Sequence, residues 1–484
     1  MTAFDQIILD YLYPFIRINN FVITGYFVFI NIAYIFMLMI AFNAIKKYSQ
    51  HVQSLEMKNL FLSPFAKPVS LLVPAYNEEA SIVESVRSIL QLQYPTYEIV
   101  LVNDGSTDDT LDKLLSSFDL IKTKNVYRPQ LPCNDIRGIY ESSTYSNLIV
   151  VDKVNGGKAD SLNAGINISK YPLICSLDAD SVLESDVLLK IVRPFMEDQT
   201  TVAAGGSIRI ANGCEIFNGR VTKIGLPKTL LGKFQVMEYL RSFLAGRVAF
   251  SIVNALIIIS GAFGVFKKDK VIEIGGYKTG SVGEDMELVL RLHARLREKK
   301  EPYNITFIPD PVCWTEAPEN LKILSLQRRR WQRGLLESLL GNKQIFLNPR
   351  YGIIGFLAYP FFLIAEGIGP VIEVLGFVLF FASWYFDMVA YPLIYLFVLA
   401  TIVLNILLSI GSIIFEEMTY QRYPNTSMIL KLIGLSFIEV FIYRPLTVWY
   451  RLVGLFEYFT GKKGGWGKMV RKGFQEQQKE LAQK

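Results

Sequence analysis

The stretch KPVSLLVPAYNEEASIVESVRSIL, residues 67–90, is typical of one unit of an α/β protein. An apolar run comes first, a loop that contains Pro74 follows, and apolar residues then recur at the spacing of an amphipathic helix. Residues 97–115, YEIVLVNDGSTDDTLDKLL, repeat this pattern, with a strand at 98–102, an acidic turn and a helix from about 108. Such alternation of strands and helices predicts an α/β fold with a mostly parallel sheet.

Two further strands are expected downstream, and polar residues follow both. LIVVDK (148–153) leads to NGGKADSLNAGI (155–166), and PLICSLDAD (172–180) ends on two acids. Parallel α/β sheets bind their ligands at the carboxyl ends of the strands. Polar side chains stand after each strand of this chain, at Asn77, Asp104, Lys158, Asp178 and Asp180. Their shared position predicts a ligand site at this edge of the sheet.

The motifs at these strand ends exclude two common nucleotide sites and favour a hard cation. PAYNEE (74–79) stands where a dinucleotide fold would have GxGxxG, and NGGKAD (155–160) lacks the spacing and the hydroxyl of a P-loop. An Asp-x-Asp at a strand end suits Mg²⁺, which takes one or two carboxylates and completes its shell with phosphate oxygens and water. Each motif also has a purely structural interpretation, because acidic residues commonly cap or begin helices.

The composition predicts a soluble domain joined to membrane helices. Of the 484 residues, 51% are hydrophobic and 19% are charged, and the net charge is +6. Residues 21–44 are uncharged and long enough to span a bilayer, and the lysines Lys46, Lys47 and Lys58 after them place the following segment in the cytosol. No small-residue cleavage site follows, so this segment is expected to be an anchor. Residues 5–17 are expected to form an interfacial helix.

Four parts of the chain follow from this pattern. They are an interfacial and transmembrane helix (1–50), a cytosolic α/β domain (66–345), C-terminal transmembrane helices (350–460) and a basic cytosolic tail (461–484). The uncharged residues 248–266 are nearly long enough to span a membrane. A span there would separate the acids at 178–180 from GED at 283–285, so we expect a buried helix and strand instead.

The C-terminal apolar stretches leave the topology open. They lie at about 351–386, 389–415 and 428–450. Three spans after a single N-terminal one would leave the basic tail outside, against the positive-inside rule. Either 351–386 makes two short passes around EGIGP (366–370), or 428–459 lies partly in the interface.

Several classes of site are not expected. The four cysteines, Cys133, Cys175, Cys214 and Cys313, include no CxxC pair, and the two histidines are far apart, which argues against a zinc site or a disulfide framework. No basic stripe with interleaved aromatic residues suggests binding of nucleic acid.

Five motifs, taken together and in this order, resemble those of the family 2 membrane glycosyltransferases. This family includes the cellulose, chitin, hyaluronan and poly-N-acetylglucosamine synthases. The motifs are VPAYNE (73–78), NDGS (103–106), DAD (178–180), GED (283–285) and QRRRW (327–331). The resemblance covers about 66–345 and the flanking membrane layout, and the combination of DxD, ED and QxxRW is specific. VCWTEAPE (312–319) also looks like the bacterial polysaccharide synthases, whereas 119–147 looks like an insertion without an assigned role.

The resemblance implies a GT-A fold that binds a nucleotide sugar, usually UDP-linked, with Mg²⁺ or Mn²⁺. Carried over by motif, the implied nucleotide contacts are Tyr76 and Asp104 at the uracil, Lys158 at the diphosphate and Asp178 near the nucleotide, with Asp180 as the metal ligand. Asp285 is the implied general base. It takes the proton of an acceptor hydroxyl that attacks the anomeric carbon from the face opposite UDP and inverts it. Implied contacts to the acceptor or the diphosphate are Gly261, within Ser260–Ala262, and Glu284, Gln327, Arg330 and Trp331.

The stretch QRRRWQRG (327–334) is predicted to be an interfacial helix at the cytosolic surface. On a helix, Gln327, Arg330, Trp331 and Gly334 share one face, because they recur at i, i+3, i+4 and i+7. Such a face suits a sugar ring and a diphosphate. Arg328 and Arg329 are expected to point elsewhere, toward lipid headgroups.

The leading hypothesis is a multi-pass cell-membrane enzyme that polymerises a sugar from a UDP-sugar in the cytosol and passes the chain through its own helices. The product would be β-linked and of the poly-N-acetylglucosamine or cellulose type. One alternative is a non-processive transferase that adds a single sugar to a lipid acceptor. Another is an export or receptor subunit with a degenerate transferase domain, and the intact Asp180, Asp285 and Trp331 argue against it.

The expected partners are the UDP-sugar, the growing polysaccharide or lipid acceptor, membrane lipids and an export or regulatory subunit. Glu366 and Glu373 stand within an apolar stretch, seven residues apart. Charges inside a bilayer are costly and are usually functional. We expect these two acids to share a helix face and to line the path of the polymer.

Overall fold

The apolar run at residues 69–75 forms β1, a central strand of a ten-stranded sheet. The computed structural model describes residues 13–54, 66–124, 127–217, 219–386, 391–420, 422, 423 and 425–461. From one edge to the other, the sheet contains β3 (Leu120–Thr123), β4 (Ile136–Ser142), β5 (Leu148–Lys153), β2 (Tyr97–Asn103), β1 (Val69–Ala75), β6 (Leu173–Leu177), β11 (Phe263–Lys267), β8 (Thr201–Ile210), β12 (Asn304–Thr315) and β7 (Val182–Leu183). A separate two-stranded ribbon pairs β9 (Glu215–Phe217) with β10 (Arg220–Lys223).

The four strands expected from the sequence form the parallel centre of this sheet. β5, β2, β1 and β6 lie side by side and run in the same direction, which confirms the predicted α/β arrangement. The sheet as a whole is mixed, since β11 runs antiparallel to β6 and β8, and β3, β4 and β7 pair antiparallel at the two edges. All residues of β5, β6 and β8 are buried, as a sheet covered on both faces requires.

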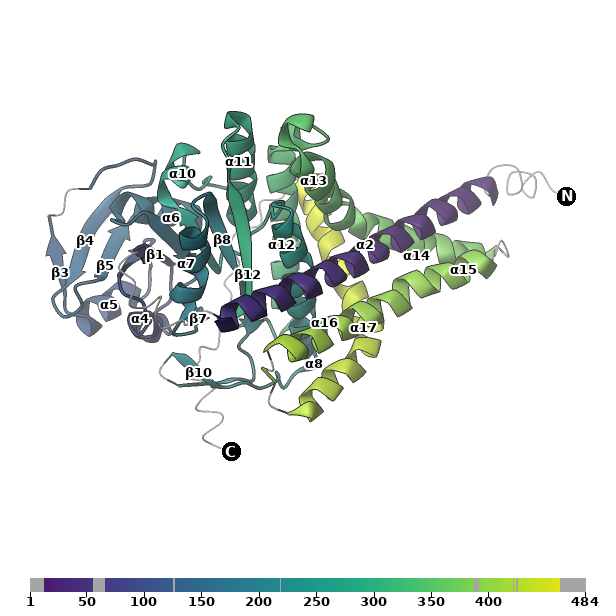
Figure 1. Ribbon diagram of the computed structural model, residues 1–484, viewed down its shortest axis with the longest axis horizontal. Coiled ribbons are helices and arrows are strands. Elements are labelled where there is room, and N and C mark those ends of the chain that lie inside the picture. The colour runs from purple at the N-terminus through teal and green to yellow at the C-terminus, as the bar shows by residue number, and fades with distance from the viewer. Residues whose placement is uncertain are drawn as a thin grey trace.

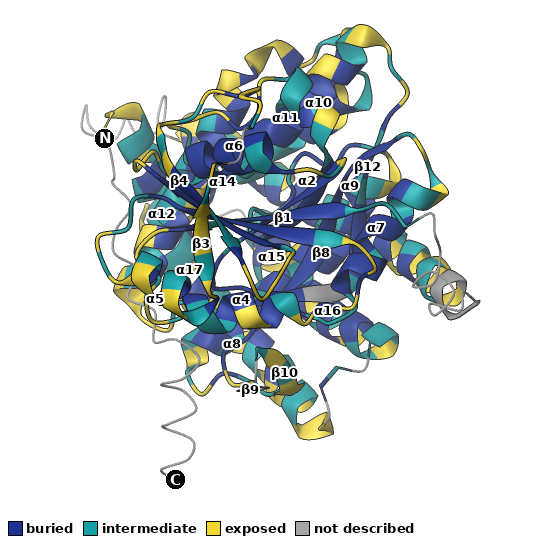
Figure 2. Ribbon diagram, turned by 90° about the vertical axis from the view of Figure 1, so that its left-hand side faces the viewer, coloured by how far each residue is buried: buried dark blue, intermediate teal, exposed yellow. Residues whose placement is uncertain are grey.

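Helices cover both faces of the sheet. Figure 2 shows α6, α10 and α11 above the dark strands and α4 and α8 below them. The helices of this region are α4 (Ile82–Leu90), α5 (Thr110–Ser117), α6 (Lys158–Ile168), α7 (Val187–Glu197), α8 (Leu230–Leu240), α9 (Val248–Ile252), α10 (Lys268–Glu273), α11 (Glu284–Lys299) and α12 (Leu321–Gly341). A π-helical segment, η2 (Arg241–Arg247), joins α8 to α9. Short 3₁₀ turns, η3 (Lys343–Ile345) and η4 (Pro349–Tyr351), follow α12.

The structure shows where two stretches lie whose fold the sequence left open. Residues 248–266 form α9, a buried loop and the start of β11, so the expected burial is confirmed. The stretch 119–147, interpreted from the sequence as an insertion, belongs to the α/β region. Its strands β3 and β4 extend the main sheet, because β4 pairs along the outer edge of β5.

The N-terminal membrane helix is longer than expected. α2 (Tyr13–Ser54) is one continuous helix of 42 residues. Residues 13–17 therefore belong to this helix and not to a separate interfacial one. Residues 5–12, Lys58 and the basic tail at 462–484 lie outside the described residues.

Three described helices are long and apolar enough to cross a membrane. They span Tyr13–Gln50, Tyr391–Tyr420 and Thr426–Phe459. A fourth candidate is a pair of helical pieces, Ile354–Gly367 and Gly369–Tyr385, which meet at Ile368 with a bend of 47°. This break falls within EGIGP, where the sequence suggested two short passes. The component elements are η5 (Ile354–Ala358), α13 (Tyr359–Phe361), η6 (Phe362–Gly367), α14 (Gly369–Tyr385), α15 (Tyr391–Val398), η7 (Leu399–Val403), α16 (Leu404–Tyr420) and α17 (Thr426–Phe459).

The last helix differs from the others in direction. α14, α15 and α16 lie alongside α2, whereas α17 runs across them and packs on α12 and α8 (Figure 1). α2 and α16 also contact the α/β region directly, at η2, α8 and α9. α12, which carries QRRRW, is held between α11 and α17.

Glycines at the contacts between α11, α12 and α17 allow the backbones of these segments to lie close together. A Cβ atom at Gly283, just before α11, would lie 2.6 Å from the carbonyl oxygen of Gly334 in α12. A Cβ at Gly454 in α17 would lie 2.7 Å from the carbonyl oxygen of Arg329, also in α12. Small residues at such contacts permit close helix packing. The GED and QRRRW segments are therefore fixed to one another by direct backbone contact.

Gly334→Ala is expected to lower the thermal unfolding midpoint of the purified protein in detergent. Alanine favours a helix over glycine, but overpacking against Gly283 should cost about 1–3 kcal/mol and outweigh that gain. Gly341→Ala is the matched control, because it lies in the same helix and no atom lies within 4 Å of its added Cβ. Equal shifts for the two variants would contradict the proposed contact.

Candidate active site

One cavity of about 1600 Å³ extends from the carboxyl ends of the strands into the apolar helices. The parallel strands bring their carboxyl ends to one edge, and α11 and α12 close over that edge. Every site residue expected from the sequence lines this cavity. These are Tyr76, Asp104, Lys158, Asp178, Asp180, Gly261, Glu284, Asp285, Gln327, Arg330 and Trp331. The cavity therefore brings together motifs that are up to 255 residues apart, from Tyr76 to Trp331.

Asp104 shapes the loop that precedes α6. Its carboxylate accepts hydrogen bonds from the Lys153 ammonium at 2.7 Å and from the backbone amides of Gly156 and Gly157 at 2.9 and 2.7 Å. Lys153 is fully buried and also pairs with Asp160 at 2.6 Å. Sequence reasoning missed Lys153. The signal available in the sequence was a lysine at the end of an apolar strand. A buried strand buries its lysine as well, and a lysine is almost never fully buried without acidic partners.

Lys158 joins three segments at the centre of the site. Its ammonium lies 2.6 Å from the Asp178 carboxylate, 3.1 Å from the Gly261 carbonyl and 3.6 Å from Glu284. Burial alone would lower the pKa of Lys158, but Asp178 and Glu284 outweigh it and the pKa is raised. Burial raises the pKa of Glu284, a shift that Lys158 opposes. Lys158 is therefore charged at neutral pH, and its positive charge offsets the negative charges of the acids that meet at the site.

The donor set of the site suits a hard divalent cation better than a metal held by protein ligands alone. Asp178 and Asp180 both line the cavity just beyond β6. Among the described residues, no group of three or more His, Cys, Asp or Glu side chains is placed to hold a metal. Two carboxylates with room for phosphate oxygens and water fit the ordinary coordination of Mg²⁺.

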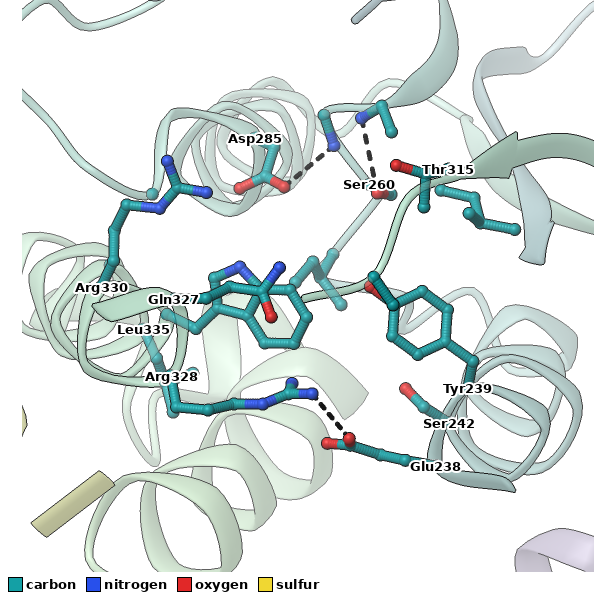
Figure 3. Close-up of a pocket in the computed structure, with 18 of the residues that line it drawn as sticks. Glu238, Tyr239, Ser242, Ser260, Asp285, Thr315, Gln327, Arg328, Arg330 and Leu335 are labelled. Atoms are coloured by element: carbon teal, nitrogen blue, oxygen red, sulfur yellow. Dashed lines mark hydrogen bonds and ion pairs between the residues drawn. The ribbon is translucent and has the colours of Figure 1, made fainter. Parts of the chain in front are cut away.

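Asp285 is oriented from the opposite side of the site. It lies in the first turn of α11, and its Oδ2 accepts a hydrogen bond of 3.0 Å from the Gly261 amide. Its Oδ1 accepts a bond of 2.8 Å from the Met286 amide. A Cβ at Gly261 would lie 2.9 Å from the Lys158 ammonium, so a larger residue there would displace the end of that side chain. Figure 3 shows Asp285, Gln327 and Arg330 projecting toward the same space.

The exposed face of α12 carries the QxxRW side chains. Trp331 is 43% exposed and lines the cavity, while Gln327 is buried. The Oε1 atom of Gln327 has no hydrogen-bond partner among the described residues. A buried acceptor without a donor is costly, so this oxygen is suited to a ligand hydroxyl.

The expectation that Arg328 and Arg329 point to lipid headgroups was wrong. Arg328 is 2% exposed, and its guanidinium donates to Glu238 in α8 at 2.7 Å and to the Tyr443 hydroxyl in α17 at 3.0 Å (Figure 3). It also lies 4.3 Å from the Trp331 ring centroid. Arg329 pairs with Glu457 of α17. The physical reason is that α17 covers this face of α12, and nothing near QRRRW in the sequence reveals that cover.

Ion pairs line the part of the cavity between the apolar helices. Glu366 pairs with Arg451 at 2.8 Å and accepts a hydrogen bond of 2.6 Å from the Tyr34 hydroxyl of α2. Glu373 pairs with Arg444 at 3.1 Å. The two acids do not share one straight helix face, because the break at Ile368 places them on η6 and α14. Both nevertheless line the cavity, and the arginines of α17 match their seven-residue spacing.

Comparisons with known proteins find similarity to glycosyltransferases. The model of "Glycosyl transferase family group 2" matches residues 173–407, and that of "Glycosyl transferase family 2" matches residues 70–130. Among solved structures, a mannosyltransferase from Pyrobaculum calidifontis, in complex with GDP-Man and Mn²⁺, is similar with a TM-score of 0.49 and 17% sequence identity. That match covers 90% of this chain and 100% of the other.

Curated relatives carry a more specific description. The poly-β-1,6-N-acetyl-D-glucosamine synthases of Staphylococcus epidermidis and of Staphylococcus aureus (strain COL) are each 30% identical to the chain over 273 residues. These matches cover 56% of this chain and 55% of each relative, so the chain spans about half the length of the curated relatives that it matches. The two family matches together cover more than half of the chain, and the chain belongs to glycosyltransferase family 2, with apolar helices on both sides of its α/β region.

Proposed function

We propose that this glycosyltransferase is a membrane synthase that extends a β-linked polysaccharide, most simply a polymer of N-acetylglucosamine. The observation that carries the proposal is the continuity of the cavity, which runs from Asp178 and Asp180 past Asp285 to Glu366 and Glu373. Its part between the helices is lined by the ion pairs Glu366–Arg451 and Glu373–Arg444, which suit a saccharide chain better than the apolar tail of a lipid acceptor. The similarity to poly-β-1,6-N-acetyl-D-glucosamine synthases supports this choice of product.

The donor is proposed to be a UDP-sugar bound at the strand ends. Asp178 and Asp180 would hold Mg²⁺ or Mn²⁺, and the bound cation supplies neutralisation of the diphosphate leaving group. Lys158 stays protonated and already lies among the acids, so it is placed to donate to a diphosphate oxygen. Tyr76 is half-exposed at the cavity wall and offers a ring for the base, and Asp104 holds the adjoining loop.

The transfer is proposed to invert the anomeric carbon. Asp285 accepts the proton of an acceptor hydroxyl, whose oxygen forms the bond to the anomeric carbon as the bond to UDP breaks. The Gly261 amide fixes the direction of the Asp285 carboxylate. Trp331 provides an apolar face for the acceptor ring, and the unpartnered Gln327 Oε1 accepts from one of its hydroxyls. The resulting hydroxyl at the end of the chain is the next acceptor.

The catalytic domain is proposed to lie in the cytosol. Lys46 and Lys47 are at the end of α2 next to this domain, as the positive-inside rule requires. If α14 and the helix at 391–420 cross the membrane and α17 lies in the interface, the chain crosses twice after the catalytic domain. The C-terminus then returns to the cytosolic side, which resolves the conflict between the basic tail and an odd number of downstream spans.

Asp285→Asn should reduce kcat for UDP release from UDP-N-acetylglucosamine by roughly 10²–10⁴-fold, the usual contribution of a general base. The KM for the donor should remain close to that of the wild-type enzyme, because Asp285 lies on the acceptor side. Asp269→Asn, an exposed acid in α10, is the control for the same chemical change. An unchanged kcat in Asp285→Asn would reject this residue as the base.

Removal of divalent cations with EDTA should abolish UDP release, and Mn²⁺ or Mg²⁺ should restore it. Asp180→Asn should shift this restoration to higher cation concentration and weaken the binding of UDP with Mn²⁺, measured by calorimetry. The calorimetric readout separates loss of cation binding from loss of turnover. Full activity in EDTA would contradict a metal-dependent site.

Neutralising one ion pair of the proposed polymer path should reduce secretion without abolishing UDP release. The variant Glu373→Gln with Arg444→Gln removes both charges together, which avoids leaving one of them buried and unpaired. The control is Arg209→Gln with Glu416→Gln, a buried pair that does not line the cavity. Secreted polymer, measured per UDP released, should fall only in the first double variant. Equal secretion in both would reject the path.

A further inference from the structure

The arginines that line the cavity differ in whether they form an ion pair. Arg241, Arg328, Arg444 and Arg451 form ion pairs with glutamates, at 3.1, 2.7, 3.1 and 2.8 Å. Arg247 also lines the cavity but forms no ion pair within the described part of the chain. Its Nη1 atom is buried there without a hydrogen-bond partner. A charged donor in this state costs free energy, which suggests that a ligand completes it.

The local structure holds the Arg247 side chain in place. Arg247 ends η2, a π-helical segment of the kind that recurs at functional sites. The guanidinium lies 3.8 Å from the Phe243 ring centroid, and Phe243 packs on Tyr239 with ring centroids 5.6 Å apart. Burial lowers the pKa of Arg247 to about 10, so the group remains charged at neutral pH.

The position of Arg247 in the cavity indicates which substrate it would contact, the acceptor or the donor. η2 packs against α2 and α16, whereas the acids of the donor site follow β6. Among the cavity carboxylates, the charge of Asp285 is the one that favours the protonated form of Arg247. Because η2 packs against two apolar helices, Arg247 lies on the side of the cavity toward the proposed polymer path. The end of a saccharide chain on that side offers hydroxyl and amide oxygens, which are the acceptors that the buried Nη1 donor lacks among the described residues.

We propose that Arg247 binds the acceptor, by donating hydrogen bonds to hydroxyl or amide oxygens of the terminal sugar of the growing chain. The planar guanidinium presents several donors in one plane, and the Phe243 and Tyr239 rings support it from behind. Binding there selects which hydroxyl of the terminal sugar faces Asp285. This inference rests on the proposed function and adds a residue outside the QxxRW motif to the acceptor site.

The test compares Arg247→Met and Arg247→Lys with the wild type, as full chains in detergent with UDP-N-acetylglucosamine and Mn²⁺. Four quantities are measured: the KM for the donor, the affinity for UDP, the sugar incorporated into polymer per UDP released, and the thermal unfolding midpoint. Arg350→Met, an exposed arginine of η4, is the control for loss of an arginine.

Arg247→Met should keep the donor KM and the UDP affinity, and lower the sugar incorporated per UDP by about tenfold, the effect of losing one charge-assisted hydrogen bond. Its unfolding midpoint should stay close to the wild-type value, because losing the contact with the Phe243 ring is offset by removing a buried Nη1 donor that has no hydrogen-bond partner among the described residues. Arg247→Lys keeps the charge without the planar fork and should give an intermediate ratio. A purely structural residue would instead lower the midpoint and every activity together.

Three outcomes would overturn the inference. Weaker UDP affinity with an unchanged incorporation ratio would assign Arg247 to the diphosphate. Wild-type ratios in both variants would leave it without a role at the acceptor. A lower midpoint with proportional loss of every activity would make its role structural. Failure of the proposed function looks different, because the wild type itself would then release UDP without making polymer or would not release it, and the inference would fall with it.

Discussion

The ammonium of Lys158 holds together a site that would otherwise repel itself. Asp178, Glu284 and Asp285 come from two segments that are distant in sequence, and they converge on one cavity wall. Their like charges oppose that convergence in a region of low dielectric constant. Lys158 contacts Asp178, Glu284 and the Gly261 carbonyl, and so links the end of β6, the start of α11 and the loop before β11. The Gly261 amide in turn orients Asp285.

A second arrangement couples this site to the apolar helices. α12 carries the QxxRW side chains on the face toward the cavity and is bound to α17 on the other. Arg328 passes between these faces, since it lies over the Trp331 ring and bonds to Glu238 and Tyr443. The Tyr443 hydroxyl also donates to Glu238 at 2.5 Å. The position of the Trp331 ring thus depends on contacts from α8 and α17 together. A shift of α17 would therefore also move this ring of the proposed acceptor site.

Two parts of the cavity differ in whether their buried charged and polar groups have partners. Between the apolar helices, glutamates and arginines are matched, as the cost of isolated charges away from water requires. Such a lining is polar without a net charge, which suits the passage of an uncharged saccharide. Near Asp285, the proposed base, Gln327 Oε1 and Arg247 Nη1 are a buried acceptor and a buried donor that have no hydrogen-bond partner among the described residues. Unsatisfied groups of this kind reduce stability in the free protein and are retained where a ligand completes them.

The local pattern of the sequence specifies the parallel strands β1, β2, β5 and β6, because their apolar runs are continuous and turn residues bound them. It also determined which polar residues would meet, since parallel strands must end at one edge. It did not reveal the cover of α17 on α12, the pairing of Arg328 with Glu238, or the isolation of Arg247. Those depend on contacts between residues as much as 128 positions apart, from Arg329 to Glu457. Local pattern carries no information about such pairs, because only the packed helices decide which charges find a partner and which are left for a ligand.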